Sequence, residues 1–392
     1  MKKSNWSIIT GAAFLMATSA IGPGFLTQTA VFTSQLGASF GFVILVSVLL
    51  DAIAQLNVWR IVVISGKPAQ EIANQLLPGL GYVLSALVFV GGMAFNIGNL
   101  AGAGLGLNVL AGCSIERGAA ISAAIAIGIF LIKEAGKMMD HFARVLGILM
   151  ILLTLYIAWI SHPPVAETLA RSVAPSTFSF TALLTIVGGT VGGYITFAGA
   201  HRLLDAGMGG RQSLRDVNRG AVSAIGLASL MRILLFLAAL GVISSGKVLD
   251  PANPPASVFR LASGELGYKF FGLVMWSAAI TSVVGAAYTS VSFVKSFHQA
   301  IGKNSRSIII GFITVSCLLF LSIGQPVKTL LVVGALNGLI LPVALATMLL
   351  AAYRSRLVGN YKQPLWLSIA GVLVVAIMAW MSYGVLIQLA GK

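Results

Sequence analysis

Residues 188–194 read Gly-Gly-Thr-Val-Gly-Gly-Tyr and lie inside an apolar segment that covers 180–203. A transmembrane helix needs about 20 apolar residues, so this segment is long enough for one membrane span. Two glycine pairs so close together weaken a helix, because glycine loses the most conformational freedom on folding. We therefore expect a span whose helix is interrupted near the middle of the membrane.

A second interruption is predicted near the start of the chain. Gly22-Pro23-Gly24 divides the apolar segment 8–31, and proline removes a backbone N–H while clashing with the turn before it. Within a membrane, free backbone polar groups are tolerated only where they are buried in protein or line a cavity. Both breaks are therefore expected to present backbone groups to a substrate site near mid-membrane.

The composition places the whole chain in a membrane. Hydrophobic residues make up 58% of the 392 residues and charged residues 9%, with a mean hydropathy of +0.96. A soluble domain carries about 25% charged residues, so this chain cannot cover a water-facing surface. We predict one all-α transmembrane domain over residues 1–392, surrounded by the lipid bilayer, with about eleven membrane helices. Their expected ranges are 8–31, 40–64, 82–112, 118–134, 144–161, 180–203, 220–245, 266–296, 305–323, 327–352 and 366–390.

The basic residues predict the orientation of these spans. The net charge is +15, and most of the 25 lysines and arginines fall in loops that share one side when the N-terminus is cytoplasmic. Cytoplasmic loops carry such an excess, so we predict a multi-pass plasma-membrane protein with its C-terminus outside. A basic stripe with interleaved aromatic residues is missing from the sequence, which argues against a nucleic-acid partner.

The two breaks predict an internal repeat. The first five segments (8–161) and the next five (180–352) can be laid over each other, each set opening with a broken span, and 366–390 is left as an extra helix. Because five is odd, the second repeat is inverted relative to the first, a recurrent design of secondary transporters. The alternative is that the glycines only permit close helix packing.

The side chains near the breaks indicate what could bind there. Neither break carries a carboxylate, histidine, cysteine or methionine, and a divalent ion held only by neutral oxygens would keep an uncompensated charge. A small carboxylate or amino-acid-like solute fits better, and we predict no metal site and no cofactor. The predicted substrate-binding residues are Gly22, Pro23, Gly24, Phe25, Gln28, Asn96, Asn99, Gly189, Gly192, Gly193, Tyr194 and Phe197.

Asp51 and Arg232 are the clearest charges inside predicted spans. Such charges are costly and are usually paired or functional. They could form a salt bridge between the repeats, Arg232 could receive a substrate carboxylate through two hydrogen bonds, or Asp51 could carry a coupling proton. Asn96 and Asn99, one turn apart, could bind the substrate or tie helices together.

Several short motifs resemble those of the NRAMP (natural resistance-associated macrophage protein) divalent-metal transporters. Residues 22–27, Gly-Pro-Gly-Phe-Leu-Thr, resemble the Asp-Pro-Gly-Asn break of that family. Residues 188–194 resemble its sixth span, where the family reads Thr-Val-Met-Pro-His. Residues 105–110, 285–288 and 341–344 resemble parts of its third, eighth and tenth spans, in the same order. The resemblance covers nearly the whole chain and implies the LeuT-type inverted-repeat fold.

The chain departs from this family at the metal-binding positions. The family's metal-binding aspartate falls on Gly22, its asparagine on Phe25, its methionine on Gly192 and its proton-path histidine on Tyr194. The acidic pair of its third span falls on the two asparagines named above. The resemblance therefore implies the fold and the position of the site, without metal ligation.

The residues and the resemblance together predict a secondary transporter of a small organic acid or amino-acid-like solute, coupled to H⁺ or Na⁺. The resemblance implies 5-oxoproline as one example of such a solute. Thr281 and Ser282 resemble the hydroxyl pair that helps to hold sodium in LeuT-type transporters, although they could instead bond to their own helix. A nucleophile elbow and a P-loop are missing from the sequence, so we do not expect an enzyme. Two alternatives are a divalent-metal (Mn²⁺ or Mg²⁺) transporter and a non-transporting membrane sensor or scaffold.

Overall fold

The computed structural model describes residues 13, 16–17, 20–132, 135–295 and 299–390. Most of the first half of the predicted span 8–31 lies outside these residues. All elements within them are helical. They are α2 (Pro23–Leu36), η1 (Gly37–Ser39), α3 (Phe40–Ser65), α4 (Ala69–Leu76), α5 (Leu80–Ala111), α6 (Ile115–Leu131), α7 (Ala135–Ile160), α8 (Val165–Val173), α9 (Phe180–Val191), α10 (Ile195–Asp205), η2 (Arg211–Ser213), α11 (Leu214–Ser244), α12 (Pro254–Lys295), α13 (Gln299–Lys303), α14 (Ser305–Ile323), α15 (Pro326–Ala351), α16 (Ser355–Val358) and α17 (Leu365–Ala390).

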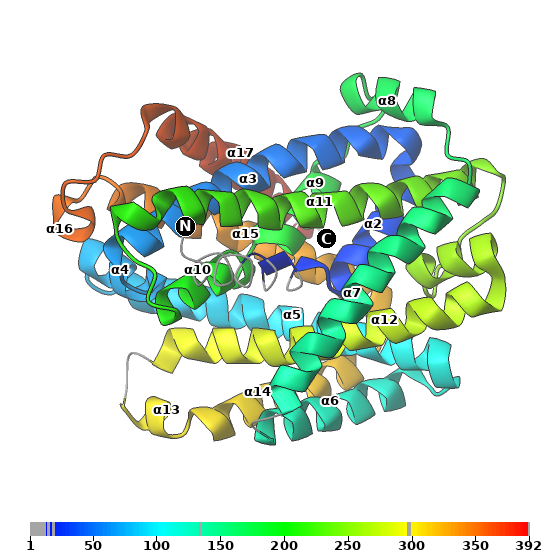
Figure 1. Ribbon diagram of the computed structural model, residues 1–392, viewed down its shortest axis with the longest axis horizontal. Coiled ribbons are helices and arrows are strands. Elements are labelled where there is room, and N and C mark those ends of the chain that lie inside the picture. Colours follow the sequence, from blue (N-terminus) through cyan, green and yellow to red (C-terminus); the bar gives the residue numbers. More distant parts are fainter. Residues whose placement is uncertain (1–12, 14–15, 18–19, 133–134, 296–298, 391–392) are drawn as a thin grey trace.

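The long helices form one bundle. Helices α3, α11, α5 and α12 run along the longest axis of the molecule, while the short helices α4, α13 and α16 lie at one end and α8 at the other (Figure 1). Helix α12 packs along α5, α15 packs on α9 and α5, and α11 packs on α3. The broken helices α2, α9 and α10 are held among these longer ones, so their free backbone groups are shielded from lipid.

Each of the eleven predicted segments contains helix in the described residues, although not every one is a separate long apolar helix. Within the described ranges, eight helices are long and apolar enough to cross a membrane, or nine if the bent pair Val145–Ile160 and Val165–Val173, which meet at 108°, is one span. Helices α2 and α3 continue through η1 as one stretch, Pro23–Ser65, which merges two predicted segments. Helix α6 has only 17 residues, near the shortest length that spans a bilayer.

Both predicted helix breaks are present. Gly22 has an extended backbone (φ −102°, ψ −175°), and α2 begins at the next residue with Pro23 in its first turn, where a missing N–H costs little. Helix α9 ends at Val191, and α10 begins only at Ile195. Between them Gly193 has a positive φ of 54°, a conformation that glycine adopts without strain. The backbone therefore unwinds at both glycine clusters.

Glycines also let the broken helices approach their neighbours closely. A Cβ atom on Gly188 would lie 2.1 Å from the carbonyl oxygen of Gly334, so α9 and α15 pack backbone against backbone. A Cβ atom on Gly102 of α5 would lie 2.0 Å from Cβ of Pro23. The glycines thus serve both close packing and unwinding, two roles that are compatible.

Candidate functional site

The first break faces two polar side chains from other helices. A Cβ atom on Gly22 would lie 3.5 Å from Oδ1 of Asn99 on α5 and 3.4 Å from Oγ of Ser282 on α12. Nδ2 of Asn99 and Oγ of Ser282 are buried without a hydrogen-bond partner in the described structure. Buried polar groups are normally hydrogen-bonded, so these two groups are available to a bound solute or ion.

Their sequence neighbours point elsewhere. The Thr281 hydroxyl donates to the carbonyl oxygens of Ser277 (3.2 Å) and Ala278 (2.9 Å) in its own helix. Nδ2 of Asn96 donates to Oγ of Ser316 on α14 at 3.2 Å, which ties α5 to α14. Asn99 and Ser282 therefore lie at the first break, whereas their predicted partners Asn96 and Thr281 form hydrogen bonds elsewhere.

The second break is contacted by Asn337 of α15, which sequence reasoning missed. Its Nδ2 donates to the carbonyl oxygens of Gly91 (3.1 Å) and Val333 (3.0 Å). Its Oδ1 has no hydrogen-bond partner in the described structure and would lie 1.8 Å from a Cβ atom on Gly193. The available signal was a single amide within the apolar segment 327–352.

Gln28 connects the two broken spans. Its Nε2 donates to the carbonyl oxygen of Leu330 on α15 at 3.1 Å. Its Oε1 would lie 2.5 Å from a Cβ atom on Gly189 of α9, and it has no hydrogen-bond partner among the described atoms. Gln28 is fully buried, so α2, α9 and α15 meet around one polar side chain.

The three aromatic residues among the predicted substrate-binding residues lie against different neighbours. Tyr194 packs edge-to-face on Phe95 with ring centroids 5.4 Å apart, and its buried hydroxyl has no partner in the described structure. Phe197 packs on Phe293 at 5.3 Å. Phe25 lies under the guanidinium of Arg232, which is 4.0 Å from the ring centroid.

Arg232 is a buried cation beside the first break, over the ring of Phe25. It comes from α11 and is only 2% exposed. Its Nη1 donates to the carbonyl oxygen of Ile186 on α9 at 3.4 Å. Nε and Nη2 are buried without a hydrogen-bond partner in the described structure. One edge of a buried guanidinium is therefore free, between α2 and α9.

Asp51 of α3 is the matching anion and is also 2% exposed. Its charge interacts electrostatically with Arg232, while the nearby Thr190 hydroxyl of α9 donates to the carbonyl oxygen of Ile186 at 2.7 Å. The direct salt bridge that was one reading of the sequence is not formed, because no nitrogen of Arg232 lies within 4.0 Å of an Asp51 oxygen in the described structure. Oδ1 of Asp51 has no hydrogen-bond partner there, so both charges keep free atoms.

Metal-binding side chains do not gather anywhere in the part of the chain that the structure describes. No three His, Cys, Asp or Glu side chains there lie close enough together to hold one ion. Asn99 and Ser282 at the first break can offer only neutral oxygens, which are poor compensation for a dehydrated divalent cation.

Sequence comparisons place this chain among known proteins. The family described as natural resistance-associated macrophage protein-like (Nramp) matches residues 13–388. An uncharacterized membrane protein of Bacillus subtilis, YcsG, is 63% identical over 380 residues, which cover 97% of this chain and 94% of that protein. An uncharacterized membrane protein of Haemophilus influenzae is 56% identical over 374 residues, covering 95% and 94%.

Solved structures share the fold at low sequence identity. The Eremococcus coleocola manganese transporter, in complex with an aromatic bis-isothiourea compound, superposes with a TM-score of 0.73 at 16% identity, over 96% of this chain and 85% of that one. MhsT in complex with L-phenylalanine superposes with a TM-score of 0.62 at 16% identity, over 96% and 97%. Mhp1, a nucleobase-cation-symport-1 transporter with bound bromovinylhydantoin, gives 0.62 at 15% identity, over 96% and 93%. The fold is therefore LeuT-type, as the family resemblance implied.

Proposed function

Because this chain belongs to the Nramp family of membrane transporters, we propose that it is a secondary transporter of the plasma membrane for a small organic acid or amino-acid-like solute. The observation that carries this proposal is the free guanidinium edge of Arg232. The solute binds between the two helix breaks, and its carboxylate is received by that edge.

The geometry of arginine supports this role. Nε and Nη2 form one edge of the planar guanidinium, and two parallel N–H groups match the two oxygens of a carboxylate. The Phe25 ring below the guanidinium and the Ile186 carbonyl beside it fix the orientation of Arg232. A buried cation with unused donors has an unpaid desolvation cost, which an anionic solute would offset.

The breaks themselves suit an organic body. Around Gly22 a Cβ atom would make only ordinary contacts at 3.4 and 3.5 Å, and the hydroxyl of Tyr194 and the amides of Asn99 and Gln28 keep free polar atoms. Neutral donors and acceptors of this kind can bind the ring amide or amino group of a solute such as 5-oxoproline.

The solved relatives are compatible with more than one cargo. MhsT was solved with an amino acid and Mhp1 with a hydantoin, whereas the Eremococcus protein is a manganese transporter. The alternative function is accordingly divalent-metal transport, favoured by family membership. We place it second because the first break offers no carboxylate in the described structure.

Two coupling ions are compatible with the polar groups around the two breaks. Sodium would bind at the first break, where Ser282 Oγ is free and the unwound backbone offers carbonyl oxygens. A proton would be carried by Asp51, a buried carboxylate that Arg232 influences electrostatically and whose Oδ1 has no hydrogen-bond partner in the described structure. We propose that one of these two ions drives uptake.

Uptake by the purified protein in lipid vesicles tests the proposed function. A panel of labelled solutes would include 5-oxoproline, a neutral analogue that lacks the carboxylate, and Mn²⁺. We expect saturable uptake of a carboxylate, none of its neutral analogue and none of Mn²⁺. Saturable Mn²⁺ uptake that organic acids do not inhibit would contradict the proposal and favour the metal alternative.

A further inference from the structure

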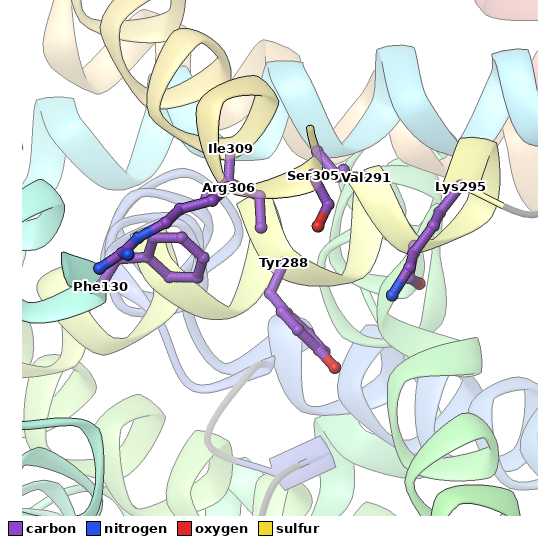
Figure 2. Close-up of a pocket in the computed structure, with 8 residues that line it drawn as sticks. Phe130, Tyr288, Val291, Lys295, Ser305, Arg306 and Ile309 are labelled. Carbon is purple, nitrogen blue, oxygen red and sulfur yellow. The ribbon is translucent and has the colours of Figure 1, made fainter. Parts of the chain in front are cut away.

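A cavity of about 350 Å³ lies between α6, α12 and α14 (Figure 2). None of its lining residues is among those gathered at the two breaks. It is lined by Phe130 of α6, by Tyr288, Val291, Ser292 and Lys295 of α12, and by Ser305, Arg306 and Ile309 of α14. Three helices thus form a second pocket, separate from the proposed transport site.

The polar side of this cavity is cationic. Lys295 and Arg306 line it together with three hydroxyl-bearing residues, and none of the eight lining residues is acidic. Neither cation has a carboxylate within 4.0 Å in the described ranges. Nη2 of Arg306 donates to the carbonyl oxygen of Leu131 at 2.5 Å, which anchors it at the end of α6. A guanidinium has five N–H donors, and this bond uses one of them.

The cavity also has apolar lining residues, and two of the helices that form it expose apolar side chains. Val291 and Ile309, which line it, are buried, and Tyr288, which also lines it, is 58% exposed. Helices α6 and α14 pack on each other. Their outer faces carry exposed apolar side chains, namely Ile121, Ile125, Leu131, Val315, Leu318 and Leu319. In a membrane protein such faces contact acyl chains.

The membrane leaflet at this end of the molecule contains anionic lipids, whose charge is opposite to that of the cavity. Lys295, Lys303 and Arg306 lie at the end of the molecule that the distribution of basic residues assigns to the cytoplasm. The inner leaflet carries anionic lipids, and basic pockets between membrane helices bind their headgroups. A phosphodiester needs cations and hydroxyl donors, and its two acyl chains need an apolar surface beside them.

We propose that this cavity binds the phosphate headgroup of an anionic phospholipid, with its acyl chains along the exposed faces of α6 and α14. Lys295 and Arg306 pair with the phosphate oxygens, and Tyr288 and Ser305 donate to the phosphate or to the glycerol. The bound lipid joins α12, which also carries Ser282, to α14 and α6.

Native mass spectrometry of the purified full chain tests this proposal, with dioleoyl-phosphatidylglycerol and dioleoyl-phosphatidylcholine as probes. The test variant is Lys295→Gln/Arg306→Gln. The matched control is Arg354→Gln/Arg356→Gln, which removes the same charge at exposed positions outside the cavity, at the same predicted side. At about 1 kcal/mol per basic residue, the test variant should bind phosphatidylglycerol on the order of 30-fold more weakly than the wild type, and the control within about threefold.

Three outcomes would overturn the lipid site. The first is an equal loss of phosphatidylglycerol affinity in both variants, which would mean non-specific attraction to a basic protein. The second is no loss of affinity in the test variant. The third is full displacement of phosphatidylglycerol by inorganic phosphate, which would mean a small-anion site. Because Arg306 also bonds Leu131, Lys295→Gln is measured alone as well. This variant keeps that bond and should lose about fivefold in affinity.

Discussion

The guanidinium of Arg232 lies over the ring of Phe25, with its central carbon 4.0 Å from the ring centroid. This contact joins α11 to α2 at the first turn after the helix break at Gly22. A cation over an aromatic face is favourable by about 2 kcal/mol when desolvated. The Phe25 ring covers one face of the guanidinium, so the edge formed by Nε and Nη2 stays free for a planar anion.

Arg232→Lys should therefore weaken carboxylate binding although the charge is kept. Lysine cannot present two parallel N–H groups, and losing one charged hydrogen bond of 1.5–3 kcal/mol corresponds to roughly a 10- to 100-fold loss of affinity. Arg260→Lys is the matched control, because Arg260 pairs with Glu265 on the exposed surface, where such pairs contribute little. Equal affinities of the Arg232 variant and the control would argue against the assigned role. The measurement is solute affinity by calorimetry.

Ser282→Ala and Thr281→Ala form a matched pair for the coupling ion. The Ser282 hydroxyl is free at the first break, whereas the Thr281 hydroxyl already bonds to its own helix. We expect Ser282→Ala to abolish stimulation of uptake by a sodium gradient and Thr281→Ala to preserve it. The assay is flux with sodium replaced by choline at fixed pH. Unchanged wild-type uptake in choline would rule out sodium and assign coupling to a proton on Asp51.

The breaks and most helix ends were predictable from the sequence, because proline and paired glycines act locally on the backbone. The structure confirms the breaks at Gly22 and at Gly192–Tyr194, and helix α14 has the predicted range 305–323. The amphipathic helices α4 and α8 were missed, since they are too short and polar to be found by a search for apolar spans. The boundaries of the two repeats stay a prediction.

Gly22→Asp should create a divalent-cation site that the wild type lacks. The backbone at Gly22 accepts a side chain, since its φ is −102° and a Cβ atom would make only ordinary contacts at 3.4 and 3.5 Å. The new carboxylate would join the oxygens of Asn99 and Ser282, a ligand set that suits Mn²⁺ or Mg²⁺. The neutral control is Gly22→Asn.

Saturable Mn²⁺ binding by Gly22→Asp and not by Gly22→Asn is the expected result, measured by calorimetry. If the wild type already binds Mn²⁺ as tightly as Gly22→Asp, the absence of a carboxylate is not what determines the cargo.

Gly188→Ala should destabilise the fold. The added methyl group would lie 2.1 Å from the Gly334 carbonyl oxygen and 2.3 Å from the Gly338 nitrogen. Both are backbone atoms that cannot rotate away, and overpacking of this kind costs about 1–3 kcal/mol. Gly226→Ala in α11 is the control, because nothing lies within 4 Å of its Cβ position. Thermal unfolding in detergent should show a lower Tm for the first variant only; equal values would mean that α9 and α15 can separate freely.

The contacts of the candidate site were less predictable than its location. Asn96 and Asn99 are one turn apart, yet one bonds to α14 and the other faces Gly22, a difference that depends on which helices pack against α5. Asn337 lies beside Gly193 in space, although the two residues are far apart in the sequence. The free edge of Arg232 follows from the positions of Phe25 and Ile186 in three dimensions, which hydropathy and spacing do not encode.

Titration calorimetry of the wild type and of Arg232→Lys, each with 5-oxoproline, a panel of related carboxylates and Mn²⁺, tests the central claim most directly. We predict saturable binding of a carboxylate to the wild type, at least tenfold weaker binding to Arg232→Lys, and no saturable binding of Mn²⁺ to either. Saturable Mn²⁺ binding that is retained in Arg232→Lys, with no carboxylate bound by either protein, would contradict it.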